Sequence, residues 1–315
     1  MLTLQVSSRI DEARGIAGLV LTDPQGVDLP PWEPGSHIDV HIDRAGVPPL
    51  IRQYSLCGDP DDHSAYRIAV LREDAGEGGS LHLNERVRQG QLVRVSEPRD
   101  LFRFTVRERM VFVAGGIGIT PILPMVRRAA MYGVDWQLHY AGRDPSTMAF
   151  GADLDQYGDR VHVYVSSEGQ RMALSDVVDE AADAGAVIYA CGPTRLLDAA
   201  TAEAEAVGAD LFIERFSNTM DVATDSDTAF EVELSVSGRT LTVNPGETIL
   251  DKVIEAGIPA PSSCRGGTCG TCETFIVEGV ADHRDAVLSA AEREENEVMM
   301  ICVSRCKGAR LVLEL

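Results

Sequence analysis

Four cysteines near the end of the chain constrain the fold more than any other feature of the sequence. Cys264, Cys269 and Cys272 are separated by four and then by two residues, and Cys302 follows thirty residues after Cys272. The residues between the first three are mostly glycine and threonine, which lets a loop wrap closely. A fold that brings the four thiols together must therefore hold this loop against a segment far along the chain.

The spacing of these cysteines is typical of plant-type iron–sulfur proteins, in which four thiolates hold a [2Fe–2S] cluster. A structural zinc site usually takes its ligands from two short chelating pairs, whereas here three thiols would come from one loop and the fourth from a distant strand. Backbone amides of the small loop residues can donate to the cluster sulfurs. We therefore predict a [2Fe–2S] cluster on Cys264, Cys269, Cys272 and Cys302, with Cys306 as the less well spaced alternative for the fourth ligand.

The composition narrows the class of protein. A formal net charge of -21 would repel a nucleic-acid backbone, so no nucleic acid is expected as a partner. Seven cysteines at unequal spacings suit thiolate ligation in a reducing compartment better than paired disulfides. No apolar run is long enough to span a bilayer, and the N-terminal stretch MLTLQVSSRIDEARG lacks the pattern of a signal peptide. We expect a cytoplasmic protein with no membrane segment.

Strand and helix patterns divide the chain into three regions and predict a multidomain fold. Residues 1–105 contain short β-rich runs between Pro/Gly turns, which predicts a small antiparallel β-barrel. Residues 106–224 alternate apolar strands with helical stretches, which predicts an α/β domain with a parallel sheet. A polar linker is expected over residues 217–229. Residues 225–315 then contain a hairpin, a helix, the cysteine loop and further strands.

Local signals predict where some elements begin and end. Thr194 and Ser175 are expected to cap helices of the parallel region. The stretch SAAE, which begins at Ser289, fits a capping box. Ser237 and Gly238 are expected to join the two strands of the hairpin. The stretch MMICVS is expected to form a strand near the end of the chain.

A glycine turn between a strand and a helix, VFVAGGIGITP, is the first candidate ligand site. Gly115, Gly116 and Gly118 would let backbone amides approach a pyrophosphate at the positive helix end; tight packing is the alternative explanation. YAGR (residues 140–143) and ACGP (residues 190–193) follow later strands, and open α/β sheets bind ligands at the carboxyl ends of their strands. Together these segments predict a dinucleotide site.

The glycine turn and the CGP segment resemble the pyridine-nucleotide domain of ferredoxin–NADP reductases. This resemblance implies that Thr120 and Pro121 line the nucleotide pocket. It also implies that the turn at Cys191 and Gly192 faces the nicotinamide, with Cys191 in a catalytic position. An ordinary buried cysteine is the alternative interpretation of Cys191.

The residues alone fit either NADH or NADPH. Arg143 or Arg171 would suit a 2′-phosphate, whereas Glu168 would suit a free ribose diol. The family resemblance favours NADH, with NADPH as the alternative.

A flavin is expected between the dinucleotide and the cluster, because a hydride carries two electrons and a [2Fe–2S] cluster accepts one. RQYS, which ends at Ser55, resembles the RxYS motif of the same reductase superfamily. The resemblance implies that Arg52 pairs with phosphate, Tyr54 packs on or hydrogen-bonds the flavin, and Ser55 reaches the flavin N5 edge in a catalytic position. A surface arginine without a ligand is the alternative.

Two further segments are expected to contact the flavin. Gly78, Gly79 and Ser80, within GEGGSLH, would supply amides and a hydroxyl for a phosphate nest; an unrelated glycine loop is the alternative. Phe216, in IERFS, resembles the terminal aromatic residue that covers the isoalloxazine face in this superfamily. A core phenylalanine would fit the composition equally well.

The order of barrel, nucleotide domain and C-terminal plant-type ferredoxin resembles the phthalate dioxygenase reductase family, which includes the vanillate demethylase-type reductases. This resemblance implies a β-grasp ferredoxin domain at residues 225–315, with FMN in the barrel and NADH as the electron donor. It also implies that the cluster passes electrons to a terminal oxygenase of the Rieske type. Arg265, at the tip of the cysteine loop, is then the first candidate for contact with that partner.

Two other functions fit parts of the pattern. The chain could be the electron-transfer subunit of a dihydroorotate-type dehydrogenase, in which the flavin is FAD and the partner is another flavoprotein. It could instead be a redox sensor that keeps the domains without turnover. Identification of the extracted flavin separates the first alternative from the reductase, and steady-state NADH oxidation separates the second.

Overall fold

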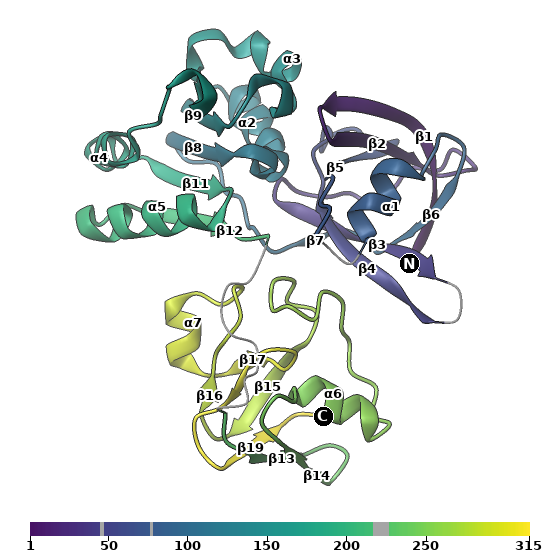
Figure 1. The fold of residues 1–315 in the computed structure, drawn as a ribbon. Coiled ribbons are helices and arrows are strands. Elements are labelled where there is room, and N and C mark those ends of the chain that lie inside the picture. Colours follow the sequence, from purple (N-terminus) through teal and green to yellow (C-terminus); the bar gives the residue numbers. More distant parts are fainter. Residues whose placement is uncertain (45–46, 76–77, 217–226) are drawn as a thin grey trace. The chain divides into compact units, whose positions relative to one another are not determined.

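A computed structural model describes residues 1–44, 47–75, 78–216 and 227–315 (Figure 1). The chain forms two compact units, Met1–Arg215 and Phe216–Leu315. Most of the linker expected over residues 217–229, and the boundary expected after residue 224, lie outside the described residues. Within the described ranges no helix combines the length and the apolar composition that a bilayer crossing requires.

The first part of the larger unit is an antiparallel sheet that closes on itself. A short helix, α1 (Gly79–Glu85), follows the fifth strand. The strands pair in the order β4-β3-β6-β1-β2-β5, with β7 beside β3. A bridge between Leu56, just after β4, and Ile68 in β5 joins the two ends of this order, which confirms the expected β-barrel. The strands are β1 (Leu2–Ala13), β2 (Ile16–Thr22), β3 (Ser36–Arg44), β4 (Val47–Ser55), β5 (Ala65–Leu71), β6 (Leu92–Val95) and β7 (Arg99–Asp100).

The second part of this unit is a parallel sheet in the order β10-β9-β8-β11-β12. The first strand, β8, therefore lies between β9 and β11, and the direction in which strands are added reverses at this point. Ligands of open α/β sheets bind at such a reversal. The strands are β8 (Arg109–Gly115), β9 (Asp135–Gly142), β10 (Val161–Val165), β11 (Val187–Cys191) and β12 (Leu211–Glu214).

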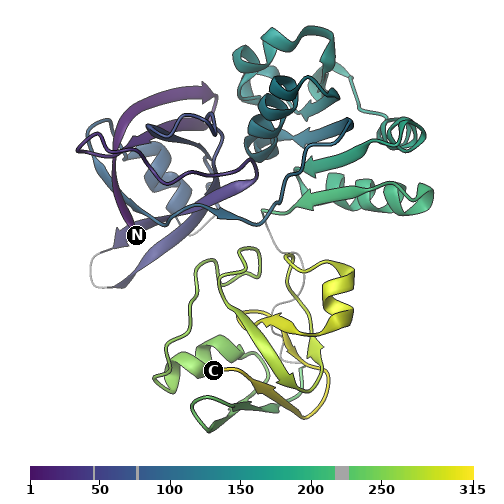
Figure 2. The ribbon, with the colours of Figure 1, turned by 180° about the vertical axis from the view of Figure 1, so that it is seen from behind.

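Helices cover both faces of the parallel sheet, as Figures 1 and 2 show. Helix α2 packs on one face through an apolar cluster that includes Phe112 and Ile122, and α4 and α5 pack on the other through a cluster that includes Val113 and Leu197. Neighbouring residues such as Phe112 and Val113 point to opposite faces because side chains alternate along a strand. The helices are α2 (Ile119–Tyr132), α3 (Gly151–Leu154), α4 (Leu174–Ala184) and α5 (Thr194–Val207), with 3₁₀ turns η1 (Gly116–Gly118), η2 (Pro145–Thr147), η3 (Asp155–Arg160) and η4 (Ser166–Glu168).

The smaller unit combines a mixed sheet with short helices. Its main sheet has the order β14-β13-β19-β15-β17, in which β13 and β19 are parallel and the other pairs are antiparallel. Helix α6 buries Ile249, Leu250 and Val253 in the core of this unit. The elements are β13 (Phe230–Leu234), β14 (Arg239–Val243), α6 (Ile249–Glu255), β15 (Glu273–Glu278), β16 (Ala281–Asp282), α7 (Ala290–Glu295), β17 (Val298–Met300), β18 (Arg305–Cys306) and β19 (Arg310–Leu313).

Some element ends differ from the sequence prediction. Helix α5 begins at Thr194 and α4 begins at Leu174, so Thr194 and Ser175 lie inside the first turns and cap neither helix. The Pro193 carbonyl accepts the first hydrogen bonds of α5, from Leu196 and Leu197, because the tight turn after β11 starts the helix directly. The predictions that Thr194 and Ser175 are caps were therefore wrong.

The smaller unit confirms the other local predictions in part. The Ser289 side chain and Glu292 form the expected capping box of α7. The expected hairpin is present, but its turn contains four residues, from Ser235 to Gly238, instead of two. The strand expected over MMICVS ends at Met300, because the Met300 carbonyl accepts the N–H of Val303 and Ser304 and so forms a turn.

Candidate functional site

The glycine turn and the turn after β11 pack against each other at the carboxyl edge of the parallel sheet. A Cβ on Gly118 would lie 2.3 Å from the Cys191 carbonyl oxygen, and a Cβ on Gly115 would lie 2.6 Å from Pro193 Cδ. Both glycines are therefore required by close packing. Gly116 instead has φ +54 and open space at its Cβ position, so its backbone conformation favours glycine. The two turns leave this edge accessible at Gly116.

The side chains next to these turns are buried. Thr120 and Pro121 lie in the first turn of α2 within the core, and Thr120 Oγ1 donates to the Ile117 carbonyl at 2.9 Å. Cys191 ends β11 and is fully buried, and burial raises the pKa of its thiol well above the ordinary value. Cys191 is thus a neutral thiol beneath the turn, whereas Gly192 is partly exposed. The ligand contacts expected of Thr120, Pro121 and Cys191 stay predictions.

Charged side chains of both signs follow the neighbouring strands. Arg143 comes directly after β9 and is exposed, and Glu168 and Arg171 are exposed just after β10. The Ser167 N–H donates to the Arg143 carbonyl at 2.9 Å, which holds the two loops together. The edge therefore offers both a carboxylate and guanidinium groups to the ribose of a dinucleotide.

The three residues of the flavin motif lie on β4. Arg52 and Tyr54 share one face of the strand because they are two residues apart. Tyr54 packs against the barrel core, and burial raises the pKa of its phenol. A Cβ on Gly79 would lie 2.8 Å from Arg52 Cγ, so this glycine leaves room for the arginine beside α1. The arginine and this glycine form a narrow cradle beside α1, and its contact with a flavin phosphate stays a prediction.

Residues 76–77, at the start of the predicted phosphate nest, lie outside the described residues, and the structure shows the nest from Gly78 onward. Gly78 has φ +89 and precedes α1 directly. Ser80 Oγ accepts the Glu73 N–H at 3.1 Å and lies 3.4 Å from the Glu73 carbonyl. The Ser80 hydroxyl therefore joins α1 to the end of the preceding loop, and its contact with phosphate stays a prediction.

Ser55 meets a carboxyl group that the sequence analysis missed. Glu214 ends β12 and pairs with Cys191 across the parallel strands. Its carboxyl group lies beside the Ser55 hydroxyl, and its Oε2 is buried with no hydrogen-bond partner among the described residues. Burial, and to a smaller extent Asp100, raises the pKa of Glu214 to about 8. This group is therefore mostly protonated at pH 7, between the flavin motif and the turn predicted to face the nicotinamide.

Phe216 lies two residues after Glu214, and its side chain is 45% exposed. This exposure argues against the alternative of a core phenylalanine. Its contact with the flavin face stays a prediction. The position of Glu214 at the carboxyl end of a parallel strand, two residues before Phe216, was the sequence signal that could have identified it.

The four predicted cluster ligands form two adjacent pairs in the smaller unit. The Cys264 thiol contacts that of Cys269, and the Cys272 thiol contacts that of Cys302. The neighbouring Cys269 thiol lowers the pKa of Cys264 below its ordinary value. Two adjacent pairs of thiols match the two irons of a [2Fe–2S] cluster, and ligation by these four cysteines stays a prediction.

Backbone donors surround the first ligand. The N–H groups of Gly266 and Thr268 point to Cys264 Sγ at 3.3 and 3.5 Å. Cys306 lies on β18, where its Sγ accepts the Gly308 N–H at 3.2 Å and lies 3.4 Å from the Arg310 carbonyl. These contacts hold Cys306 within the turn that follows β18 and favour Cys302 as the fourth ligand.

The cysteine loop is supported by a neighbouring turn. The Ala286 N–H donates to the Gly267 carbonyl at 2.8 Å. The fully buried Asp285 carboxylate accepts the N–H groups of Val287 and Leu288 at 3.0 and 2.8 Å, which fixes the turn that carries Ala286. At the tip of the loop, Arg265 has φ +54 and forms an ion pair with Asp251 at 3.0 Å.

Comparison with known proteins identifies the domains in which these candidate sites lie. A model described as "2Fe-2S iron-sulfur cluster binding domain" matches residues 232–307, and one described as "Oxidoreductase NAD-binding domain" matches residues 112–202. Over 318 residues the chain is 41% identical to phenoxybenzoate dioxygenase subunit beta of Ectopseudomonas oleovorans, a match that covers 98% of this chain and 97% of that protein.

Solved structures share the fold over nearly the whole chain. Phthalate dioxygenase reductase is 36% identical with a TM-score of 0.70, and the match covers 100% of this chain and 98% of that one. An intact type IV self-sufficient cytochrome P450 monooxygenase is 40% identical with a TM-score of 0.91. That match covers 99% of this chain but 41% of the longer P450 chain.

Fold and site together define an NAD(P)H-dependent oxidoreductase that contains a flavin barrel, a nucleotide-binding sheet and an iron–sulfur domain. The chain belongs to the phthalate dioxygenase reductase family. This family membership confirms the expected fold class and the expected cofactors FMN, NADH and the [2Fe–2S] cluster.

Proposed function

We propose that this chain is the reductase component of a two-component oxygenase system and that it passes electrons from NADH to a Rieske-type terminal oxygenase. The observation that carries the proposal is the pairing of two sites in one chain. The Ser55–Glu214 contact joins a flavin motif to a nicotinamide turn. The two thiol pairs of the smaller unit suit a one-electron carrier.

When bound, the cofactors would supply the redox chemistry, which is hydride acceptance from NADH and release of single electrons to a [2Fe–2S] cluster. The protein binds and orients them. Arg52 and the cradle at Gly79 hold the flavin phosphate, and the turn at Gly116 admits the pyrophosphate of NADH. Ser55 and the protonated Glu214 offer hydrogen bonds in the space between the two reactants. Cys264, Cys269, Cys272 and Cys302 ligate the cluster.

The three functional regions are proposed to be residues 1–105 for the flavin, 106–224 for NADH and 225–315 for the cluster. In the first region the flavin is bound by residues 52, 54, 55 and 78–80, and Phe216 covers it. In the second region NADH is bound by residues 115, 116, 118, 120, 121, 143, 191 and 192. None of the seven cysteines is paired in a disulfide, and this state, together with the use of NADH, supports a cytoplasmic location.

The proposed partner class rests on the relatives. One relative is named as a subunit of a phenoxybenzoate dioxygenase, and phthalate dioxygenase reductase is named after the oxygenase that it serves. These names support an oxygenase as the electron acceptor of this chain. A Rieske centre in that oxygenase is the finer part of the proposal.

Spectroscopy of the purified protein tests the proposal. We expect visible flavin and iron–sulfur absorbance that bleaches with NADH, two irons per chain, FMN on extraction and NADH-dependent reduction of cytochrome c. Extracted FAD would favour the dihydroorotate-type alternative, and a loaded protein without NADH turnover would favour the sensor. A colourless protein that contains zinc would contradict the proposal.

A further inference from the structure

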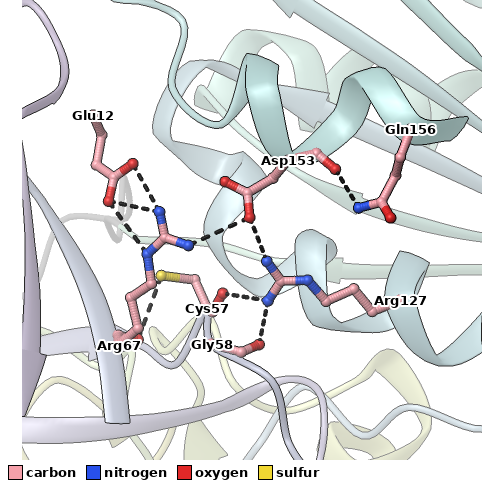
Figure 3. Close-up of polar contacts among 7 residues, drawn as sticks. All are labelled: Glu12, Cys57, Gly58, Arg67, Arg127, Asp153 and Gln156. Carbon is pink, nitrogen blue, oxygen red and sulfur yellow. Dashed lines mark hydrogen bonds and ion pairs between the residues drawn. The ribbon is translucent and has the colours of Figure 1, made fainter. Parts of the chain in front are cut away.

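Two arginines connect the β-barrel to the nucleotide-binding part of the larger unit (Figure 3). Arg127, on α2, donates through Nη1 to the carbonyl oxygens of Cys57 and Gly58 at 3.0 and 2.6 Å. Arg67, on β5, donates through Nη1 to Asp153 Oδ1 at 3.4 Å. Each arginine therefore extends from its own part of the larger unit to a residue of the other part.

Asp153, in α3, is the residue at which the two arginines meet (Figure 3). Its Oδ1 also accepts Arg127 Nη2 at 2.6 Å. Arg67 Nη2 lies 2.8 and 2.9 Å from the two carboxylate oxygens of Glu12, and its guanidinium stacks 4.9 Å from the centre of the Phe150 ring. The four charged side chains balance as two cations and two anions, and none is more than 24% exposed.

Because this network is buried, the loss of one partner costs more free energy than the loss of a surface ion pair. Removal of one partner of a buried pair leaves an uncompensated charge, which costs several kcal/mol. The planar guanidinium also fixes the direction of each contact. Arg128 offers a contrast on the same helix, because its partner Asp61, at 3.1 Å, is 57% exposed, and such pairs contribute little.

The network joins the two segments that the reaction must align. Helix α2, which carries Arg127, begins directly after the glycine turn η1. Cys57 and Gly58, which Arg127 contacts, follow Ser55 by two and three residues. Displacement of either segment would change the gap between nicotinamide and flavin, and a misplacement of about 1 Å can cost on the order of 10²-fold in rate.

We propose that Arg127 and Asp153 are positioning residues that hold the nucleotide-binding sheet against the flavin barrel at the separation that hydride transfer requires. This inference rests on the proposed function. In the step concerned, the C4–H bond of NADH breaks, its hydrogen and electron pair pass to the flavin, and NAD⁺ leaves. Arg127 and Asp153 are not among the residues that we assign to either reactant, and they act through the segments that carry those residues.

Arg127→Lys tests the proposal, because lysine keeps the charge but cannot contact a carboxylate and two carbonyls with one rigid fork. In FMN-loaded protein mixed anaerobically with NADH, the limiting rate of flavin reduction should fall at least tenfold. The NADH Kd and the FMN content should stay within twofold, and the rate should show a full isotope effect with NADH deuterated at the transferred position. Arg128→Lys, the same change on the next residue, should leave the rate unchanged.

Hydrogen exchange gives a second readout that does not depend on turnover. Without NADH, exchange of the backbone amides in residues 56–62 and in α2 should increase in Arg127→Lys and not in Arg128→Lys. Asp153→Asn, which keeps the shape of the side chain, should repeat both effects and provides the test if Arg127→Lys does not fold.

Flavin reduction within twofold of wild type in both Arg127→Lys and Asp153→Asn would overturn the inference. A loss of FMN without a slower limiting rate in the loaded molecules would also overturn it, since that is the result of a purely structural role. Failure of the wild-type protein to reduce its flavin would instead count against the proposed function.

Discussion

The buried carboxyl group of Glu214 gives the larger unit an unusual dependence on pH. Its pKa is raised from the ordinary value of 4.5 to about 8, mainly by burial. Below about pH 4.5 the folded and unfolded chains both hold the proton. Between about pH 4.5 and about pH 8 only the folded chain holds the proton. The free energy of unfolding therefore falls with rising pH by up to about 1.4 kcal/mol per pH unit. Above about pH 8 this effect levels off.

Glu214→Gln should remove this pH dependence, because an amide does not ionise. Measured as thermal unfolding of the FMN-loaded protein, the Tm difference between variant and wild type should shift in favour of the variant from pH 5 to pH 8 and then stay constant. Glu205→Gln, a change of an exposed acid on α5, is the control and should give a difference independent of pH. A constant difference for Glu214→Gln would show that the carboxyl titrates near its ordinary pKa.

Arg265 is the residue at which docking of the partner should be tested first. It is exposed at the tip of the cysteine loop and is paired only with the half-exposed Asp251 among the contacts described. Arg265→Glu should slow electron transfer to the partner oxygenase about tenfold by placing a repulsive charge at the contact, and it should leave NADH-dependent flavin reduction intact. Arg239→Glu on β14 makes the same charge change elsewhere on the unit and should slow neither step. The reverse pattern for Arg265→Glu would refute this placement.

At the scale of elements, the turn at residues 285–288 should decide how firmly the cysteine loop holds its cluster. Asp285→Ala leaves the N–H groups of Val287 and Leu288 without their acceptor, and unsatisfied buried groups cost about 1–3 kcal/mol each. The Gly267 carbonyl then loses its fixed donor, Ala286.

We expect faster thermal bleaching of the iron–sulfur absorbance in Asp285→Ala and unchanged flavin reduction. Ser289→Ala removes the cap of α7, at a cost of about 1 kcal/mol, without touching the loop. It should lower the Tm of the unit while the cluster is retained. Equal cluster loss in the two variants would mean that general stability, and not the turn, holds the loop.

The elements that the sequence predicted well are those with local signals. The capping box at Ser289 and the hairpin after Phe230 depend on neighbouring residues, and both are present. The predicted caps at Thr194 and Ser175 were wrong because both helices start earlier than predicted. The turn at Pro193 starts α5 at Thr194, and α4 starts at Leu174. The strand around Cys302 ended early because Met300 begins a turn, which the apolar pattern does not reveal.

The site was predictable where one segment forms it. Cys264, Cys269 and Cys272 are spaced along one loop, and their spacing alone indicated the cluster. The contact between Ser55 and Glu214 instead joins two sheets, and no local pattern pairs residues so far apart in the sequence. The same is true of Arg67, Asp153 and Arg127, which become neighbours only when barrel and parallel sheet pack together.

At the scale of the whole molecule, the division of labour follows the two compact units. The larger unit contains every residue that we assign to NADH and all but Phe216 of those that we assign to the flavin, and the smaller unit contains every cluster ligand. A change in one unit should therefore separate the two halves of the electron path. Cys302→Ser makes this separation, because it removes one ligand of the thiol pair with Cys272 and leaves the larger unit unchanged.

The most direct test of the account is anaerobic stopped-flow absorbance of the purified protein mixed with NADH. In the wild type we expect the flavin band to bleach first and the iron–sulfur band to follow, with uptake of about 1.5 equivalents of NADH, since a flavin takes two electrons and a [2Fe–2S] cluster takes one. Cys302→Ser should bleach the flavin at the wild-type rate, take up about one equivalent and fail to reduce cytochrome c. A wild-type cluster that stays oxidised beside a fully reduced flavin, or a variant that reduces cytochrome c at the wild-type rate, would contradict the proposed electron path.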